Sequence, residues 1–244
     1  MNNEYRTMGG TLQKETAGVD FYRSFITKVY GWMAAGLGIT TAAAAVTAAV
    51  VAANVTEENF ESLHGLFIAA LIVEIVLVMA ISWGINRISP AVAGVLFLIY
   101  SIVSGVTIAP IVFVYTGTSI AVTFGITAGT FAAMSLYGYF TKADLTSFGN
   151  IMMMGLWGIV IATIINIFWA NETLYWVISY LGVAIFTGLV AYDTNKLKGI
   201  AMSIEDGSVE RATASKIAIL GALNLYLDFV NLFLMLLRFF GKRR

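Results

Sequence analysis

Long apolar runs, broken by short polar segments, dominate the hydrophobic pattern of this chain. Four stretches contain no Asp, Glu, Lys or Arg: 29–56, 88–141, 145–171 and 173–192. A helix needs about 20 predominantly apolar residues to cross roughly 30 Å of hydrocarbon. The strands of a membrane β-barrel would instead alternate polar and apolar positions, and these runs do not alternate. The pattern predicts an all-α polytopic membrane protein.

Seven membrane spans fit between the polar segments. They cover about residues 26–50, 62–86, 90–113, 119–140, 147–169, 173–197 and 216–239. The breaks between them are short, except for a longer loop at 198–215. We therefore expect a polar cytoplasmic tail at 1–22, a helical membrane domain at 23–241 and a basic tail at 242–244.

The two prolines of the chain fall at informative places in the third span. Ser89 followed by Pro90 is typical of a helix start, with serine as the N-cap and proline at the first helical position. Pro110 lies near the far end of the same span. We expect it to kink the helix there, because proline removes a backbone hydrogen-bond donor.

The distribution of basic residues predicts a cytoplasmic N-terminus by the positive-inside rule. Lys and Arg precede the first span and occupy every second loop, whereas the intervening loops carry Glu57, Glu58, Glu61 and Glu172 without any Lys or Arg. The basic residues after the last span break this pattern, because seven spans place that tail outside. We expect seven spans, and a last segment that enters and returns on the cytoplasmic side is the alternative.

Composition narrows the possible functions. The chain is 59% hydrophobic and only 11% charged, far from the roughly 25% charged residues of a soluble domain. It has no cysteine and one histidine, which excludes disulfides, thiol catalysis and clusters of Cys or His metal ligands. A formal net charge of zero gives no indication of nucleic-acid binding.

A polar stripe runs along the last span. Asn224, Asp228 and Asn231 follow one another at i, i+4 and i+7, and Arg238 lies seven residues further along the same face. The other positions are mostly Leu, Phe and Val, so this helix should lie at the centre of the bundle. A structural hydrogen-bond network is the alternative explanation, although asparagines alone would serve packing at a lower desolvation cost.

Asp193 lies near the cytoplasmic end of the sixth span, three residues before Lys196. One interpretation is a boundary residue paired with Lys196 or Lys198. The other is that it meets Asp228 of the last span. Asp228 lies nearly 18 Å along its helix from Lys216, at about 1.5 Å per residue. The two depths match better if the last helix begins in the cytosol and enters the membrane near Leu220.

If the two carboxylates meet, their chemistry is that of a pH switch. Like charges a few ångströms apart in a low dielectric cannot both ionise cheaply, so such a pair shares a proton. In the ionised form the same oxygens suit Ca²⁺ and other hard cations. Protons and cations would therefore compete for this site, and we expect Asp193 and Asp228 to be a pH gate and a metal-binding pair.

Two further charged residues of the second span are candidates for the same pathway. Glu74 lies at the middle of the span, where a carboxylate is either protonated or lines a water-filled path. Arg87, at the cytoplasmic end, is either a positive-inside anchor or a residue that reaches toward Asp193. Asn224 and Asn231 are the other polar side chains that we expect to line the pore.

Four segments together resemble the transmembrane Bax inhibitor motif family. They are LIVEIVLVMAISW in the second span, VSGVTIAPIV in the third, GLVAYDTNKLK in the sixth and LNLYLDFVNLFLMLLRFFG in the last. The resemblance covers residues 25–241. It implies a helical bundle with a central last helix and a pH-sensitive Ca²⁺ leak, gated by the aspartates at positions 193 and 228.

The resemblance also bears on the second span. It matches Glu74 to the carboxylate that the family carries there. An arginine of the family that latches onto the aspartate of the sixth span corresponds to Ile85 here, with Arg87 two residues later. Arg87 is therefore the latch candidate of this chain.

Other functions remain open alongside a calcium leak channel in a bacterial cytoplasmic (inner) membrane. A proton-coupled cation exchanger and a non-conducting regulatory or partner protein fit the same residues. An intramembrane aspartyl protease also needs two aspartates on adjacent helices, but one of them should lie in Gly-x-Gly-Asp, and Asp228 follows LYL. We expect no enzymatic activity and no cofactor, with the lipid bilayer, protons and Ca²⁺ as partners, and the sequence identifies no protein partner.

Overall fold

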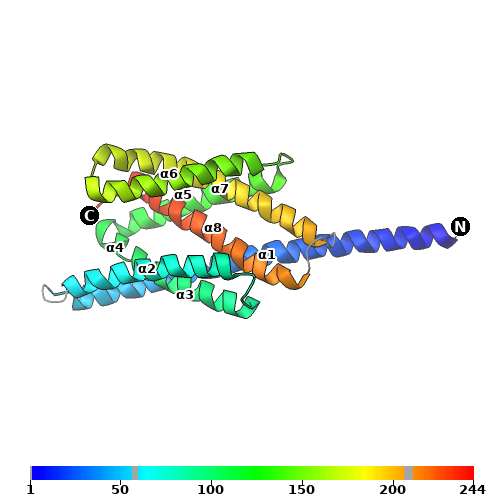
Figure 1. Ribbon diagram of the computed structural model, residues 1–244, viewed down its shortest axis with the longest axis horizontal. Helices are drawn as coiled ribbons and strands as arrows, with labels where there is room; N and C mark the ends of the chain where they lie inside the picture. The colour runs from blue at the N-terminus through cyan, green and yellow to red at the C-terminus, as the bar shows by residue number, and fades with distance from the viewer. Residues whose placement is uncertain (1, 57–59, 206–210) are drawn as a thin grey trace.

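The computed structural model describes residues 2–56, 60–205 and 211–244, and helices account for nearly all of them (Figure 1). In chain order they are α1 (Asn2–Asn54), α2 (Phe60–Gly84), α3 (Pro90–Ile108), α4 (Ile111–Val114), α5 (Gly117–Phe140), α6 (Thr146–Trp169), α7 (Glu172–Glu205) and α8 (Arg211–Phe240). The described residues contain seven helical segments long and apolar enough to cross a membrane, with α3 and α4 together forming one of them. The predicted seven-helix fold is confirmed.

Local signals at both prolines act as predicted. Ser89 caps α3, because its hydroxyl accepts a hydrogen bond from the backbone N–H of Val92, and Pro90 occupies the first turn. Pro110 separates α3 from the four-residue α4. This break turns the chain toward α5, whose N-cap Thr116 accepts a hydrogen bond from the backbone N–H of Ser119.

Helix α8 lies at the centre of the bundle. In Figure 1 it crosses the middle of the molecule, between α1–α3 on one side and α5–α7 on the other. It packs against α1, α3, α5 and α7. Of its most apolar window, 61% is buried inside the protein, compared with 6% for α2 and α6. The central position predicted from the polar stripe is therefore confirmed.

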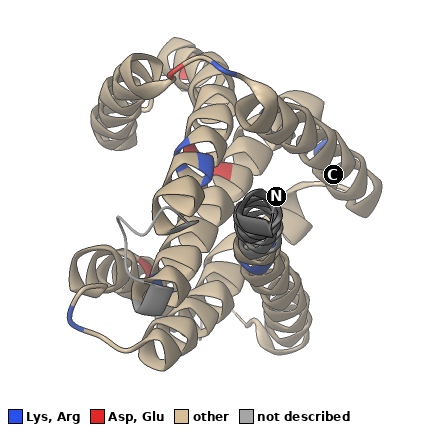
Figure 2. Cartoon of the chain, turned by 90° about the vertical axis from the view of Figure 1, so that its right-hand side faces the viewer, with Lys and Arg blue, Asp and Glu red and all other residues tan. Residues whose placement is uncertain are grey.

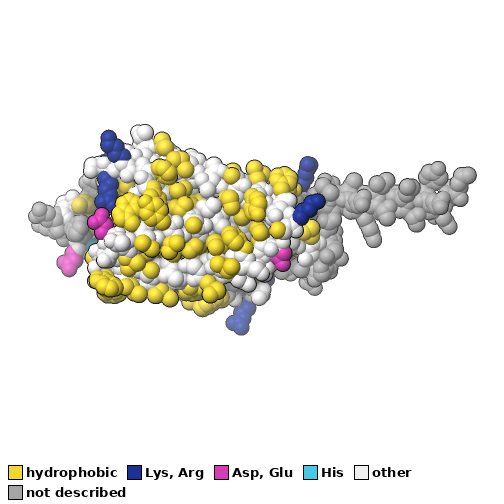
Figure 3. All heavy atoms as spheres, turned by 90° about the horizontal axis from the view of Figure 1, so that it is seen from above, with side chains coloured by type: hydrophobic (Ala, Val, Ile, Leu, Met, Phe, Trp, Pro, Cys, Tyr) yellow, Lys and Arg dark blue, Asp and Glu magenta, His cyan; other side chains and the backbone are white. Residues whose placement is uncertain are grey.

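The outer surface is apolar between two charged ends. Figure 2, seen from the end where α1 begins, shows few charged residues among the helices, and Figure 3 shows hydrophobic side chains spread along the length of the bundle, with the basic and acidic side chains gathered near its two ends. The exposed residues of α6 include Phe168 at 86% and Met154 at 75%. Exposed apolar area on this scale is not sustained in water, and it fits helices that face lipid.

The end of the sixth span and the start of the seventh differ from the prediction. We expected a loop over 198–215, but α7 continues to Glu205 and α8 already begins at Arg211. Leu197, Ala201 and Ile204 are buried and recur at helical spacing, so α7 packs against the bundle beyond its apolar segment. Lys198 contributes too, because its ammonium donates to the carbonyls of Tyr139 and Thr141 at the end of α5.

The C-terminal tail lies at the end of the bundle opposite the start of α1 (Figure 1). Helix α8 is continuous up to Phe240, and the tail then pairs with the connection between α4 and α5. The N–H of Thr116 donates to the carbonyl of Lys242, and the N–H of Arg244 donates to the carbonyl of Val114. The last segment therefore runs through the whole bundle and does not return to the side from which it started.

The contact between α5 and α7 depends on a glycine. A Cβ atom at Gly138 would collide with the carbonyl oxygen of Ala191 on α7. We expect Gly138→Ala to lower the free energy of unfolding by about 1–3 kcal/mol, the usual cost of overpacking, seen as a lower thermal midpoint in detergent. Gly129→Ala on the same helix is the control, because its added Cβ would have nothing within 4 Å. Equal losses from both variants would contradict this contact.

Candidate functional site

The carboxylate of Asp228 is enclosed in the centre of the bundle. Its side chain is only 5% exposed, and its Oδ2 atom has no hydrogen-bond partner within the described part of the chain. The neighbouring Phe229 explains the enclosure. Its ring meets Phe124 and Phe131 of α5 edge-on at centroid distances of 5.2 and 5.5 Å. Packing of aromatic rings thus fixes the face of α8 that carries the aspartate.

Asp193 comes to this region from α7, which packs along α8. The side chain is half-buried, and its charge acts directly on that of Asp228. The structure therefore brings together the two carboxylates that the sequence singled out. They lie on adjacent helices and within electrostatic reach of each other.

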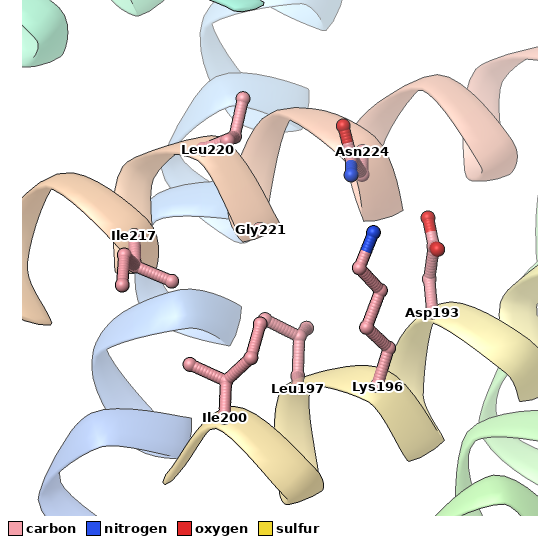
Figure 4. A pocket seen from close by; sticks show the side chains of 8 residues that line it. All are labelled: Asp193, Lys196, Leu197, Ile200, Ile217, Leu220, Gly221 and Asn224. Carbon is pink, nitrogen blue, oxygen red and sulfur yellow. The ribbon is translucent and has the colours of Figure 1, made fainter. Parts of the chain in front are cut away.

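A small cavity adjoins the aspartate pair. It has a volume of about 50 Å³ and lies between α7 and α8, and Asp193, Lys196, Gly221 and Asn224 are among the residues that line it. Figure 4 shows the side chains of Asp193 and Lys196 on α7 pointing toward Asn224 on α8. Such a volume has room for a few water molecules. Polar side chains of α7 and α8 thus lie beside Asp193 in a cavity large enough for water.

Lys196 is the cation beside Asp193. Its charge acts on the Asp193 carboxylate, and Figure 4 shows its ammonium between that carboxylate and the amide of Asn224. The sequence analysis considered Lys196 only as a boundary partner of Asp193. Their spacing of three residues is the signal, since such pairs lie on one helix face.

The remaining residues of the polar stripe have separate roles. Asn231 turns back to its own helix, where its Nδ2 donates to the carbonyl of Leu227 at 2.9 Å. Arg238 lies about 15 Å further along α8 than Asp228, at 1.5 Å per residue. There its Nη1 donates to the hydroxyl of Ser179. Only Asn224 joins Asp193 at the small cavity.

Glu74 forms a second polar centre, between α2 and α3. The hydroxyl of Tyr100 donates to its Oε1 at 3.0 Å, and the hydroxyl of Thr107 donates to its Oε2 at 2.8 Å. The ring of Tyr100 meets that of Tyr226 on α8 at 5.6 Å. The hydroxyl of Tyr226 is in turn hydrogen-bonded to that of Thr40 on α1 at 2.7 Å. This centre therefore joins α1, α2, α3 and α8.

The tyrosines of this centre were missed by the sequence analysis. Tyr226 is fully buried, and a buried tyrosine needs a partner for its hydroxyl. Its position within an apolar span was the available signal. Tyr226 follows Asn224 and precedes Asp228 by two residues, which is about 200° around a helix. The Glu74 centre and the aspartate pair therefore contact opposite sides of α8.

Arg87 lies apart from both centres. It is exposed just beyond the end of α2, at the edge of a surface cavity whose other lining residues, among them Val76, Met79 and Trp83, all belong to α2. In this arrangement Arg87 resembles a membrane anchor, and Lys196 rather than Arg87 is next to Asp193.

The oxygen ligands available for a cation are few. The described residues contain no cluster of three or more His, Cys, Asp or Glu side chains. The candidate side-chain ligands in this region are the carboxylates of Asp193 and Asp228 and the amide oxygen of Asn224. Ca²⁺ takes six to eight oxygens, so water would have to complete its shell. Such a site is suited to brief occupancy.

Comparison with known proteins gives a consistent match along the chain. Residues 22–244 match the family described as "Inhibitor of apoptosis-promoting Bax1". The inner membrane protein YbhL of Escherichia coli K12 is 48% identical over 225 residues, covering 91% of this chain and 93% of YbhL. An uncharacterized protein of Borreliella burgdorferi is 43% identical over 234 residues, covering 96% of this chain and 98% of that protein. The family match includes α7 and α8 in full.

The hydrogen bond between Tyr100 and Glu74 can be tested by a double-mutant cycle. We expect Glu74→Ala and Tyr100→Phe to be coupled by about 0.5–1.5 kcal/mol in the free energy of unfolding, the usual net contribution of a side-chain hydrogen bond. Glu74→Ala combined with Thr130→Val is the control, because the Thr130 hydroxyl bonds the carbonyl of Ile126 within α5. Additive effects in both cycles, measured by chemical unfolding in micelles, would rule out the bond.

Proposed function

Because this chain belongs to the Bax inhibitor family of membrane proteins, we propose that it is a pH-sensitive calcium leak channel. The aspartate pair of α7 and α8 forms its gate. In the closed state one proton is shared between Asp193 and Asp228. Loss of that proton leaves two carboxylates that attract a divalent cation.

The observation that carries this proposal is the unpaired Oδ2 of the enclosed Asp228 carboxylate beside a second carboxylate. A buried charge without a partner is costly, and two like charges together cost more. In the closed state a shared proton removes this electrostatic cost. In the deprotonated state a bound cation removes it. Asparagine at position 228 would serve packing alone at a lower desolvation cost, so the presence of a carboxylate there favours a binding role.

The small number of protein ligands favours a site through which calcium passes over a site that binds calcium tightly. A site that supplies two carboxylates and one amide leaves most of the calcium shell to water. The ion then binds weakly enough to leave again, which is a requirement for conduction. The cavity of about 50 Å³ between α7 and α8 brings Asp193, Lys196 and Asn224 together with apolar residues of both helices, and we assign it as the route between the aspartate pair and the cytoplasmic ends of these helices.

The ammonium group of Lys196 competes with the calcium ion for the Asp193 carboxylate. Its ammonium points to the same cavity as Asp193. Because it is exposed, it can leave the carboxylate without a large cost. We assign it the part that a latch arginine of the second span would otherwise take, since Arg87 lies on the outside of the bundle.

The location of the protein and its orientation in the membrane are part of this proposal. We assign the protein to the bacterial cytoplasmic (inner) membrane, as the name of its relative YbhL says of that protein. The N-terminus and the connection between α7 and α8 lie in the cytoplasm, where the Lys- and Arg-rich loops are expected. Asp193 and its cavity then open toward the cytoplasm.

The gate predicts a calcium flux that falls as the pH is lowered. Protons and Ca²⁺ compete for one site, so the flux into liposomes should change by up to about tenfold per pH unit between about pH 5 and pH 8, the limit for one titrating proton. We expect Asp193→Asn and Asp228→Asn each to abolish this dependence. A calcium-sensitive dye inside liposomes, read at several pH values, measures it.

Asp144→Asn is the matched control for these variants. Asp144 is exposed in the connection between α5 and α6. Hydrogen bonds from the hydroxyl and the backbone N–H of Thr146 hold its pKa below the usual value, so it stays ionised throughout. Flux that is absent at every pH, with intact folding, would favour a non-conducting partner protein. Flux that stops without a counterflow of protons would favour an exchanger.

Removal of the Lys196 charge should increase calcium occupancy. We expect Lys196→Gln to raise the flux at a fixed neutral pH by roughly two- to fivefold, the scale of a partly exposed ion pair. Arg87→Gln should leave the flux unchanged, because Arg87 does not line the cavity of Asp193. The reverse result would assign the latch to Arg87.

A further inference from the structure

A separate polar cavity lies at the end of the bundle where α8 finishes. Its volume is about 520 Å³, and it is lined from the connection between α6 and α7, the start of α7, the end of α8 and the tail. Its polar side chains are those of Asn166, Asn171, Glu172, Arg238 and Arg243, with the aromatic residues Tyr175 and Trp176 beside them. The aspartate pair has no part in this cavity.

Arg238 is held in place with most of its donors unused. Its guanidinium lies over the ring of Tyr175 at 4.6 Å from the centroid, and Nη1 donates to the hydroxyl of Ser179 at 3.1 Å. An arginine has five N–H donors. The others have no partner among the described residues, and the side chain lines the cavity. Stacking on Tyr175 therefore holds the Arg238 guanidinium in a fixed orientation, with its free N–H donors available to a ligand in the cavity.

Two asparagines also offer donors. The Oδ1 of Asn166 accepts from the backbone N–H of Asn171, and the Oδ1 of Asn171 accepts from the N–H of Leu174. These bonds complete the end of α6 and cap the start of α7. Each side-chain oxygen already accepts one hydrogen bond, and the NH₂ groups are the donors that the two asparagines can offer to a ligand.

The tail adds a second guanidinium. Besides the bonds of Thr116 and Arg244, the N–H of Lys242 donates to the hydroxyl of Ser119 at 3.0 Å. Gly241 lies so close to the ring of Tyr115 that a Cβ there would come within 2.5 Å of it. The backbone of the tail is thus fixed against the connection between α4 and α5, and Arg243 lines the cavity from this side.

The acidic member of the cavity does not cancel this charge. Glu172 is exposed in the first turn of α7, where the helix dipole stabilises a carboxylate. Two guanidiniums remain opposite one solvated carboxylate. Among the described residues neither arginine forms an ion pair. The cavity thus presents mainly hydrogen-bond donors and a net positive charge, which is a site for an anion.

The surroundings identify the anion as part of a lipid. A second cavity of about 180 Å³ shares Asn166, Tyr175 and Arg238 with the first, and its remaining lining includes the apolar Ile167 and Ile178. Ile167 is 72% exposed on the lipid-facing side of α6. The first cavity thus continues into a smaller one that adds Ile167, Ile178 and Thr163 beside the bilayer, as a headgroup continues into the start of its chains.

We propose that this pair of cavities binds an anionic phospholipid of the leaflet next to the C-terminus. Its phosphodiester is held by Arg238, Arg243 and the amide groups of the two asparagines, and the first part of an acyl chain occupies the smaller cavity. Arginine binds phosphate oxygens in a bidentate manner. This site also explains how a basic tail is accommodated on the side of the membrane that lacks basic loops.

The test is lipid binding to the purified full chain, measured by native mass spectrometry. The probes are phosphatidylglycerol, phosphatidylcholine and inorganic phosphate. We expect phosphatidylglycerol to bind more tightly than phosphatidylcholine, and Arg238→Gln and Arg243→Gln each to weaken it about tenfold or more. Lys242→Gln, which removes the same charge from an exposed tail residue outside the cavity, should change binding less than about twofold.

The outcomes separate the possible explanations. Equal losses from all three variants indicate general attraction to a basic tail and overturn the site. Equal binding of the two lipids does the same. Displacement of phosphatidylglycerol by inorganic phosphate at equal concentration would identify a soluble anion and overturn the lipid assignment. Arg243→Gln keeps the test valid if Arg238→Gln fails to fold, because Arg243 is an exposed residue that follows the end of α8.

Discussion

The cost of enclosing the Asp228 carboxylate is the constraint on which the rest of this structure depends. A carboxylate inside a membrane protein costs several kcal/mol unless it is paired, solvated or protonated. Here one of its oxygens has no partner among the described residues. The helix that carries it must therefore lie away from lipid and beside a group that can share its proton or its cation. Both conditions hold, because α8 is surrounded by four helices and Asp193 lies on one of them.

The packing around α8 explains how the enclosure is maintained. No hydrophobic effect drives helices together within lipid, so close approach and ring packing have to supply the attraction. Gly105 and Gly138 let α3 and α5 approach the backbones of α1 and α7. Phe229 and Tyr226 pack edge-on against aromatic rings of α5 and α3. These contacts fix the rotation of α8, and that rotation decides whether Asp228 faces α7 or the bilayer.

Much of the fold could be predicted because hydrocarbon imposes simple rules on sequence. The spans, the break at Pro110 and the central α8 follow from charge-free length, proline chemistry and the polar stripe. The prediction of a loop at 198–215 was wrong. It relied on the apolar run, which is interrupted by Lys196 and Lys198, whereas α7 continues beyond them with Ala201 and Ile204 buried. The early start of α8 at Arg211 also explains how the two aspartates meet. The helix has enough turns before the membrane for Asp228 to lie close to Asp193.

The pairing of side chains was harder to predict than the fold. Adjacent spans bring the two aspartates within reach, but rotation about each helix axis cannot be read from an apolar run. Lys196 was visible as a neighbour of Asp193, whereas its place in the same cavity as Asn224 depends on how α7 and α8 cross. The two hydroxyls that bond Glu74 both come from α3, whereas Tyr226 and Thr40 bring α8 and α1 to the same centre. The meeting of these four helices depends on the packed bundle and is not visible in any single sequence segment.

Three polar regions of the protein share helix α8 and are therefore mechanically connected. Asp228 faces α7, Tyr226 faces the Glu74 centre on the opposite side, and Arg238 lies at the end of the same helix. If the proposed gate opens by a rotation or shift of α8, the hydrogen bond between Tyr226 and Thr40, 2.7 Å long, would have to stretch as well. The energy of opening in this proposal would then include contacts on the far side of the helix. Substitution of Thr40 would for this reason affect the proposed gate.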